Sequence, residues 1–206
     1  MDISFETYIK AFVLLFAVID PLGTVPVFIA ATRRHPEHDK RSIALQAVSI
    51  AGGILLFFLI AGQVLLEQMG IPLSAFQVAG GIVLFLFALT MVFGEGKPED
   101  ELNAIKSKRD TAIFPLAIPS IASPGAMLAI VLLTDNHRFH VLHQTFIGLV
   151  MLLVLGITLL LLLTGGKIHK LIGDSGTSVI SRVMGLILGS VAANDVLLGI
   201  KLFFSL

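Results

Sequence analysis

The chain has 206 residues, of which 56% are hydrophobic and only 14% are charged, and its mean hydropathy is +0.96. Soluble domains carry about 25% charged residues, so the lipid bilayer is the expected solvent of a chain with this composition. The formal net charge of zero argues against a nucleic-acid partner, and the absence of cysteine excludes disulfides and thiolate metal sites.

Six segments are long and apolar enough to cross a membrane as helices, for which roughly 20 residues are needed. They cover residues 6–32, 43–66, 73–93, 112–134, 141–164 and 179–204, and polar links join them. The first segment has no preceding basic region and no small-residue cleavage site, so we expect it to be retained rather than removed as a signal peptide. The sequence therefore predicts an all-α polytopic membrane protein with six transmembrane helices in a single transmembrane domain, residues 1–206.

Lys and Arg are concentrated in the links that follow spans one, three and five. These links and the start of span six hold eleven of the fourteen basic residues, whereas the opposite side holds only Lys10, Arg138 and Lys201. Because cytoplasmic links carry an excess of positive charge, this distribution predicts that both termini lie on the periplasmic or extracellular side. The longest cytoplasmic link, 95–110, is predicted to be a solvated loop, with a short surface helix over 98–110 as the alternative.

The chain matches itself when it is shifted by about 103 residues. Asp20-Pro21 then falls on Ser123-Pro124, each pair is followed within two residues by a glycine, and segment 76–88 aligns with 180–192. Each half has three spans, and an odd number forces the second half to cross the membrane in the opposite direction. The pattern predicts inverted-topology repeats over 1–94 and 111–206, an arrangement typical of secondary transporters with sites near the midplane.

Proline and glycine interrupt the first and the fourth predicted spans, near Pro21 and Pro124. Asp-Pro and Ser-Pro both have the form of a helix N-cap followed by proline at the first helical position. We therefore expect spans one and four to break and restart near the midplane. A restarting helix has free N–H groups that attract anions, and such backbone is tolerated in a membrane only where it is buried or lines a cavity.

We interpret the two breaks as parts of one binding site. The N–H groups after Pro21 would receive a substrate carboxylate, and Asp20 would pair with the substrate ammonium or carry a coupling proton or cation. Asp20 has an equally good interpretation as a helix cap alone, and the two roles are compatible. Asp195 is a second coupling candidate, with an alternative interpretation as a residue that faces a partner helix or the membrane interface. The predicted substrate-binding residues are Asp20, Pro21, Gly23, Thr24, Ser123, Pro124, Gly125 and Asn194, and the predicted coupling residues are Asp20 and Asp195.

The sequence does not point to an enzyme. It contains no phosphate-binding loop with the required spacing, no nucleophile elbow and no zinc-protease motif. His137, His140 and His143 are expected to lie at the membrane interface rather than to bind a metal. No cofactor or metal is expected, and coupling to protons or to sodium ions is left open. The expected partners are the lipid bilayer and a small-molecule substrate, and a homo-oligomer is left open.

Three motifs give the chain a resemblance to the MarC family of bacterial inner-membrane proteins. D-P-x-G-x-x-P-x-F runs from Asp20 to Phe28, P-L-A-I-P-x-x-x-x-P-G from Pro115 to Gly125, and R-x-M-G-L-I-L from Arg182 to Leu188. The resemblance implies six spans in two inverted halves, an architecture similar to that of the lysine exporter superfamily, and a bacterial inner-membrane location. The family is named for multiple antibiotic resistance. It is also called the neutral amino acid transporter family, because some archaeal relatives are credited with cation- or proton-coupled uptake of glycine and alanine.

The preferred hypothesis is a secondary transporter of small amphoteric solutes, neutral amino acids above all, that works by alternating access around spans one and four. A second hypothesis is an exporter of drugs or metabolites, which predicts a wider and more apolar cavity. A third is a passive channel or a membrane scaffold, in which Asp20 matters only for stability.

Overall fold

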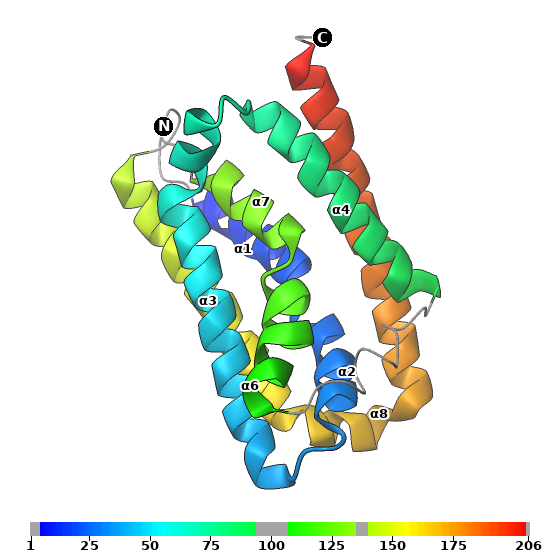
Figure 1. Ribbon diagram of the computed structural model, residues 1–206. Coiled ribbons are helices and arrows are strands. Elements are labelled where there is room, and N and C mark those ends of the chain that lie inside the picture. Colours follow the sequence, from blue (N-terminus) through cyan, green and yellow to red (C-terminus); the bar gives the residue numbers. More distant parts are fainter. Residues whose placement is uncertain (1–4, 94–106, 135–139, 205–206) are drawn as a thin grey trace.

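A computed structural model describes residues 5–93, 107–134 and 140–204 of the chain (Figure 1). In chain order its elements are α1 (Phe5–Ile19), α2 (Pro21–Thr32), α3 (Glu37–Gln68), α4 (Leu73–Phe93), α6 (Lys108–Thr111), the π-helical segment η1 (Ala112–Ile121), α7 (Pro124–Leu133) and α8 (Val141–Phe203). Every element in the described ranges is helical. Most of the predicted loop over 95–110 lies outside the described residues, and its last residues belong to the cap and first turn of α6.

Within the described residues, five helical stretches are long and apolar enough to cross a membrane. They are Glu6–Ile29, Glu37–Gln68, Leu73–Phe93, Val141–Gly165 and Arg182–Phe203, and the pair Lys108–Ile121 and Pro124–Leu133, bent by 54°, makes a sixth if it is counted as one span. These stretches overlap the six predicted segments, so the all-α polytopic membrane fold is confirmed. Large apolar side chains such as Ile60, Leu160 and Leu186 are exposed on the outer faces, which fits contact with lipid.

The fifth link differs from its expected form. The sequence predicts a polar link over 165–176 and a sixth span from 179, whereas α8 runs from Val141 to Phe203 with one non-helical residue, Gly173. Gly173 has φ +66° and ψ −177°, a conformation that is essentially restricted to glycine. No proline occurs between 141 and 203 to remove a backbone donor. The two crossings of α8 are therefore joined by helix that turns at one glycine (Figure 1).

Two pairs of consecutive helices, α1 with α2 and η1 with α7, occupy the middle of the bundle. α1 packs against α7 and α2 packs against η1. The passage from α1 to α2 therefore lies beside the passage from η1 to α7 (Figure 1). The part of α8 before Gly173 lies beside α3, where the side chain of Leu155 approaches Gly52. The part of α8 after Gly173 lies along α4. The long helices thus enclose the two central pairs.

Glycines bring α4 and the second part of α8 into close backbone contact. A Cβ added to Gly81, Gly185 or Gly199 would lie 2.9–3.0 Å from a backbone carbonyl oxygen of the facing helix. Small residues at helical spacing are the usual means by which membrane helices approach each other this closely. We therefore treat α4 and the second part of α8 as one tightly packed helix pair.

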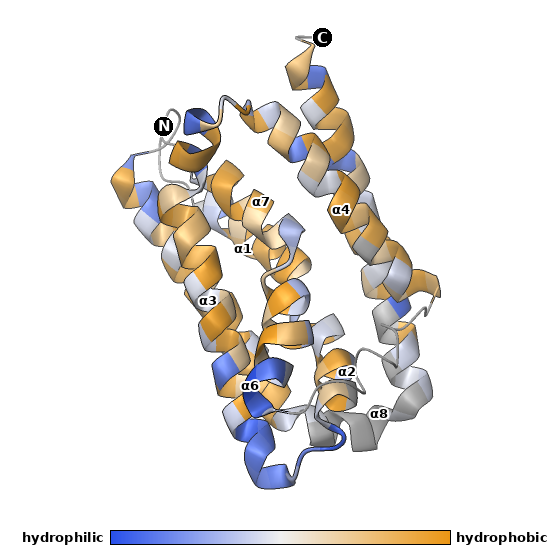
Figure 2. Ribbon diagram, in the orientation of Figure 1, coloured by the Kyte–Doolittle hydropathy of each residue, from blue (hydrophilic) through white to orange (hydrophobic). Residues whose placement is uncertain are grey.

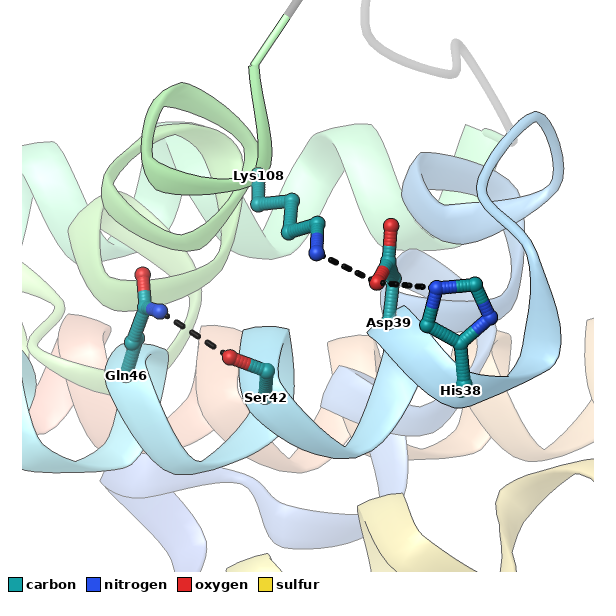
Figure 3. A network of polar contacts seen from close by, with 5 residues as sticks. All are labelled: His38, Asp39, Ser42, Gln46 and Lys108. Atoms are coloured by element: carbon teal, nitrogen blue, oxygen red, sulfur yellow. Dashed lines mark hydrogen bonds and ion pairs between the residues drawn. The ribbon is translucent and has the colours of Figure 1, made fainter.

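One end of the bundle is polar. Figure 2 shows hydrophilic residues in the turn between α2 and α3 and in α6. At this end the buried carboxylate of Asp39, near the start of α3, is paired with Lys108 of α6, and His38 lies 3.0 Å from the same oxygen (Figure 3). His35 is also hydrogen-bonded to Thr111 over 2.9 Å. These contacts connect the first half of the chain to the start of the second half.

Lys108→Met is expected to lower the melting temperature of the detergent-solubilised protein by a few degrees. The substitution removes the ammonium group from a carboxylate whose side chain is only 8% exposed and leaves it with His38 alone, and a buried charge that loses its cationic partner is destabilising. Lys40→Met is the matched control, because its partner Glu37 is largely exposed and such pairs contribute little. Equal melting temperatures for the two variants would contradict a structural role for the Lys108–Asp39 pair.

Candidate functional site

Asp20 is the single residue between α1 and α2, and only 2% of its surface is exposed. Its φ of +50° lies in the left-handed region, which among non-glycine residues is adopted mainly by Asn and Asp. Pro21, which has no N–H, is the first residue of α2, where a helix needs no such donor. The Asp-Pro dipeptide therefore accounts for the end of one helix and the start of the next.

The carboxylate of Asp20 caps α2. The N–H of Gly23 donates to Asp20 Oδ1 over 2.9 Å, and the N–H and hydroxyl of Thr24 donate to the Asp20 carbonyl oxygen over 3.0 and 2.9 Å. A Cβ on Gly23 would overlap Oδ2 of the same carboxylate. In this conformation Asp20 itself therefore occupies the donors of Gly23 and Thr24, which the sequence analysis assigned to a substrate carboxylate.

The second helix start has a similar cap made by a serine. Backbone angles inside η1 leave the helical region at Phe114 and Ile118, each of which precedes a proline. Ser123 follows as the fully buried N-cap of α7, and its Oγ accepts the N–H of Ala126 over 3.0 Å. Pro124 takes the first helical position, as the Ser-Pro dipeptide predicts.

A hydrogen bond joins the start of α7 to the end of α1, next to the start of α2. The hydroxyl of Ser123 donates to the carbonyl oxygen of Val18, in the last turn of α1, over 3.0 Å, although the two residues are 105 positions apart. The last carbonyl groups of a helix receive no N–H donor from the helix itself and need one from outside. Ser123 therefore caps α7 and supplies a donor to the end of α1, two residues before Asp20.

Ser123→Ala is expected to lower the free energy of unfolding by about 2 kcal/mol. About 1 kcal/mol comes from the lost N-cap, and a similar amount comes from the buried Val18 carbonyl that loses its donor. Ser190→Ala is the matched control, because Ser190 is exposed and its hydroxyl bonds only to Leu186 within the same helix. Denaturant unfolding in detergent measures both variants, and a loss no larger in Ser123→Ala than in Ser190→Ala would contradict the bridging role.

The predicted site residues fall into two groups. Seven of them lie at the two adjoining helix starts: Asp20, Pro21, Gly23, Thr24, Ser123, Pro124 and Gly125. Asn194 and Asp195 lie on the second part of α8 instead. Asn194 is exposed, and the half-buried Asp195 accepts a hydrogen bond from the amide of Gln77 on α4. Within the described ranges, neither residue is hydrogen-bonded to Asp20 or to Ser123.

Two apolar side chains of α4 cover the helix starts, and the sequence analysis did not single them out. A Cβ on Gly23 would lie 2.6 Å from Met91 Cε, and one on Gly125 would lie 2.7 Å from Leu84 Cδ1. The two side chains are seven residues apart, which is two turns on one helix face. That spacing is the only signal in the sequence, and it is not distinctive, because the whole of α4 is apolar.

The chain is similar to one family of known proteins along nearly its whole length. The family described as "MarC family integral membrane protein" matches residues 5–204. A UPF0056 membrane protein of Methanocaldococcus jannaschii is 35% identical over 204 residues, which is 98% of each chain. The UPF0056 inner membrane protein YhgN of Escherichia coli K12 is 31% identical over 195 residues, 95% of this chain and 96% of its own. No solved structure gives a significant match.

Proposed function

We propose that the chain, which belongs to the MarC family of integral membrane proteins, is a secondary transporter of small amphoteric solutes, neutral amino acids above all. The observation that carries the proposal is the Ser123–Val18 hydrogen bond, which joins the start of α7 to the end of α1 beside the buried carboxylate of Asp20. An ionisable side chain inside spanning helices is a functional candidate by default. Secondary transporters commonly bind their substrates where interrupted helices meet.

The charges of the helix start match those of a zwitterion. The first N–H groups of α2 attract a carboxylate, because they carry the positive end of the helix dipole. Asp20 attracts an ammonium group, and its carboxylate accepts one of these N–H groups, that of Gly23. A neutral amino acid carries both charges on adjacent atoms, so it can satisfy the two groups together.

Asp20 takes the place of the substrate carboxylate in the conformation described above. When a substrate enters, its carboxylate replaces that of Asp20 on the Gly23 N–H, and the freed Asp20 turns to the substrate ammonium. The helix start is then never left without an acceptor, which would be strongly destabilising inside a membrane. Binding and release become an exchange of one carboxylate for another on the same donor.

In this proposal the two halves of the chain, 1–94 and 111–206, form inverted repeats of one transmembrane domain. The segment 95–110 is the cytoplasmic loop between them, and spans one and four are broken near the midplane. The packing supports the repeats, because α3 and α4 each lie beside the corresponding part of α8. Alternating access then moves the α4–α8 pair, one helix from each repeat, relative to the central pairs. Its glycine contacts favour motion as a unit.

The protein is proposed to lie in the bacterial inner membrane, which is also named for the Escherichia coli relative. In this proposal the end near Asp39 and Lys108 faces the cytoplasm and both termini lie on the opposite side, because links rich in Lys and Arg favour the cytoplasm. Transport is coupled to protons or sodium ions through Asp20. Asp195, which is hydrogen-bonded to Gln77, is the second candidate for the coupling residue.

A cysteine at position 122 tests the proposed site directly, because the chain has no native cysteine. Ala122 is fully buried, directly precedes Ser123 and is not among the proposed substrate-binding residues. In Ala122→Cys, a membrane-impermeant maleimide is expected to react slowly with the new thiol, because the thiol is reached only while the site is open to one side. Glycine and alanine are expected to slow that reaction in a concentration-dependent way, and arabinose serves as a neutral control solute.

The outcomes separate the three hypotheses. Protection by glycine and alanine supports a transporter of neutral amino acids. If only larger apolar compounds slow the labelling, the second hypothesis, an exporter of drugs or metabolites, replaces the proposal. Labelling from both sides that no solute slows, or no labelling at all, would contradict alternating access and favour the channel or the scaffold.

A further inference from the structure

Asn194 is a polar residue on the outer side of α8. Ala192 and Val196, two positions before and after it, lie against Gly81 of α4. Residues two apart on a helix point in nearly opposite directions, so Asn194 points away from α4. Its side chain is exposed, and it lies near the middle of the apolar stretch Arg182–Phe203. In a single copy of the chain, this amide therefore faces the hydrocarbon of the membrane.

The amide of Asn194 has no hydrogen-bond partner among the described residues. The exposed hydroxyls of Thr164 and Ser190, by contrast, each donate to a carbonyl oxygen four residues earlier in α8. A polar group without a partner is strongly destabilising in hydrocarbon, and the bilayer core holds no water that could replace the partner. A partner for Asn194 therefore has to come from another membrane-spanning helix.

Asn194 lies within an exposed row of residues that we call the α8 seam. The members of the seam follow one another at alternating steps of four and three residues, and they are Val183, Ile187, Ser190, Asn194 and Leu197. This spacing keeps one face of a helix turned toward a parallel neighbour. Lys201 continues the spacing near the end of the span, where its long side chain reaches water. The seam thus has the pattern of a contact between helices.

We propose that the α8 seam pairs with the same seam of a second copy, in a homodimer in which the two Asn194 side chains hydrogen-bond to each other. Copies inserted in the same direction are related by a twofold axis perpendicular to the membrane, so their seams run parallel and each residue lies opposite its own copy. A side-chain amide both donates and accepts hydrogen bonds, so two asparagines satisfy each other. A single asparagine in such a seam also fixes the register and the number of helices.

The rest of the fold supports the seam without taking part in the contact. A Cβ on Gly185 or Gly199 would lie 2.9 Å from a carbonyl oxygen of α4, so α4 holds the opposite side of the same helix segment in place. The dimer is independent of the proposed transport function. It also gives Asn194 a role that is an alternative to the substrate-binding role predicted from the sequence.

Disulfide crosslinking in the membranes of expressing cells tests the contact, because the chain has no native cysteine. Ser190→Cys and Leu197→Cys, each with Asn194 retained, place a thiol on the seam about one turn before and one turn after the amide. Leu160→Cys is the matched control, because Leu160 is about as exposed as Leu197 but lies on the first part of α8. With a membrane-permeant oxidant, the two seam variants are expected to form covalent dimers, and Leu160→Cys is expected to stay monomeric.

The contribution of the amide is measured on the cysteine-free chain in liposomes. Single-molecule photobleaching over a series of protein-to-lipid ratios gives the dissociation constant of the dimer. Asn194→Leu keeps a side chain of similar size and removes the hydrogen bonds, so it is expected to weaken the dimer about 3- to 30-fold. Asn194→Gln retains the amide and is the matched control, with an expected affinity close to that of the wild type.

Crosslinking of Leu160→Cys, with none at either seam position, would place the contact elsewhere and overturn the inference. Monomers at every protein-to-lipid ratio would overturn it as well, and would leave a helix of another membrane protein to cover Asn194. An unchanged dissociation constant in Asn194→Leu would contradict the amide pair even if a dimer forms. If Asn194→Leu does not fold, the crosslinking of the two seam variants decides.

Discussion

Asp20→Asn is expected to leave the fold intact and to reduce amino-acid exchange about a hundredfold. The amide oxygen of asparagine still accepts the Gly23 N–H, and asparagine is as good a cap as aspartate. Asparagine also tolerates the φ of +50° at this position. What disappears is the negative charge for a substrate ammonium, and loss of one partner of a buried charge pair weakens binding by about 2–5 kcal/mol.

Initial exchange rates in proteoliposomes and the melting temperature in detergent measure the two parts of this prediction separately. Asp110→Asn is the matched control, because Asp110 is exposed at the start of α6 and its loss is expected to leave exchange unchanged. If Asp20→Asn exchanged alanine at the rate of the wild type, Asp20 would be a helix cap and nothing more.

Gly23→Ala is expected to have the largest effect on stability, a loss of at least about 3 kcal/mol in the free energy of unfolding. The added methyl group would overlap the Asp20 carboxylate and lie 2.6 Å from Met91 Cε, and overpacking alone destabilises by about 1–3 kcal/mol. It would also push the carboxylate away from the Gly23 N–H and leave both groups buried without a partner, which adds about 1–3 kcal/mol.

Gly53→Ala is the control for this substitution, because it adds the same methyl group to a helix at a position where nothing lies within 4 Å. It is expected to leave stability unchanged or to raise it by up to about 1 kcal/mol, since alanine favours helix more than glycine does. Unfolding by denaturant in detergent compares the two variants. Equal stability of Gly23→Ala and Gly53→Ala would mean that Asp20 does not pack against Gly23 as described.

The local features of the fold were predictable because they depend on short stretches of sequence. Span positions follow from apolar length, and the starts of α2 and α7 follow from Asp-Pro and Ser-Pro. The helical link at Gly173 was missed because composition alone marks that stretch as polar, whereas an uninterrupted backbone lets the helix continue until one glycine turns it.

The partners across the bundle were not predictable from a single sequence. Ser123 was expected to cap α7, but nothing in the sequence identifies the Val18 carbonyl, 105 residues away, as the acceptor of its hydroxyl. Met91 is one of many apolar residues in α4, and only packing distinguishes it from its lipid-facing neighbours. That the donors of Gly23 and Thr24 are occupied by Asp20 also depends on a side-chain orientation that a sequence motif does not specify.

We propose that a small zwitterion binds where the two helix starts meet and is carried across the membrane. Counterflow tests it most directly: proteoliposomes that contain the purified wild-type protein are preloaded with unlabelled alanine, and the entry of labelled alanine or glycine from outside is followed. We expect a saturable, transient accumulation above that in protein-free liposomes. The measurement is repeated with and without a proton or sodium gradient. If the protein remains folded and entry is still no faster than in protein-free liposomes, the proposal is contradicted.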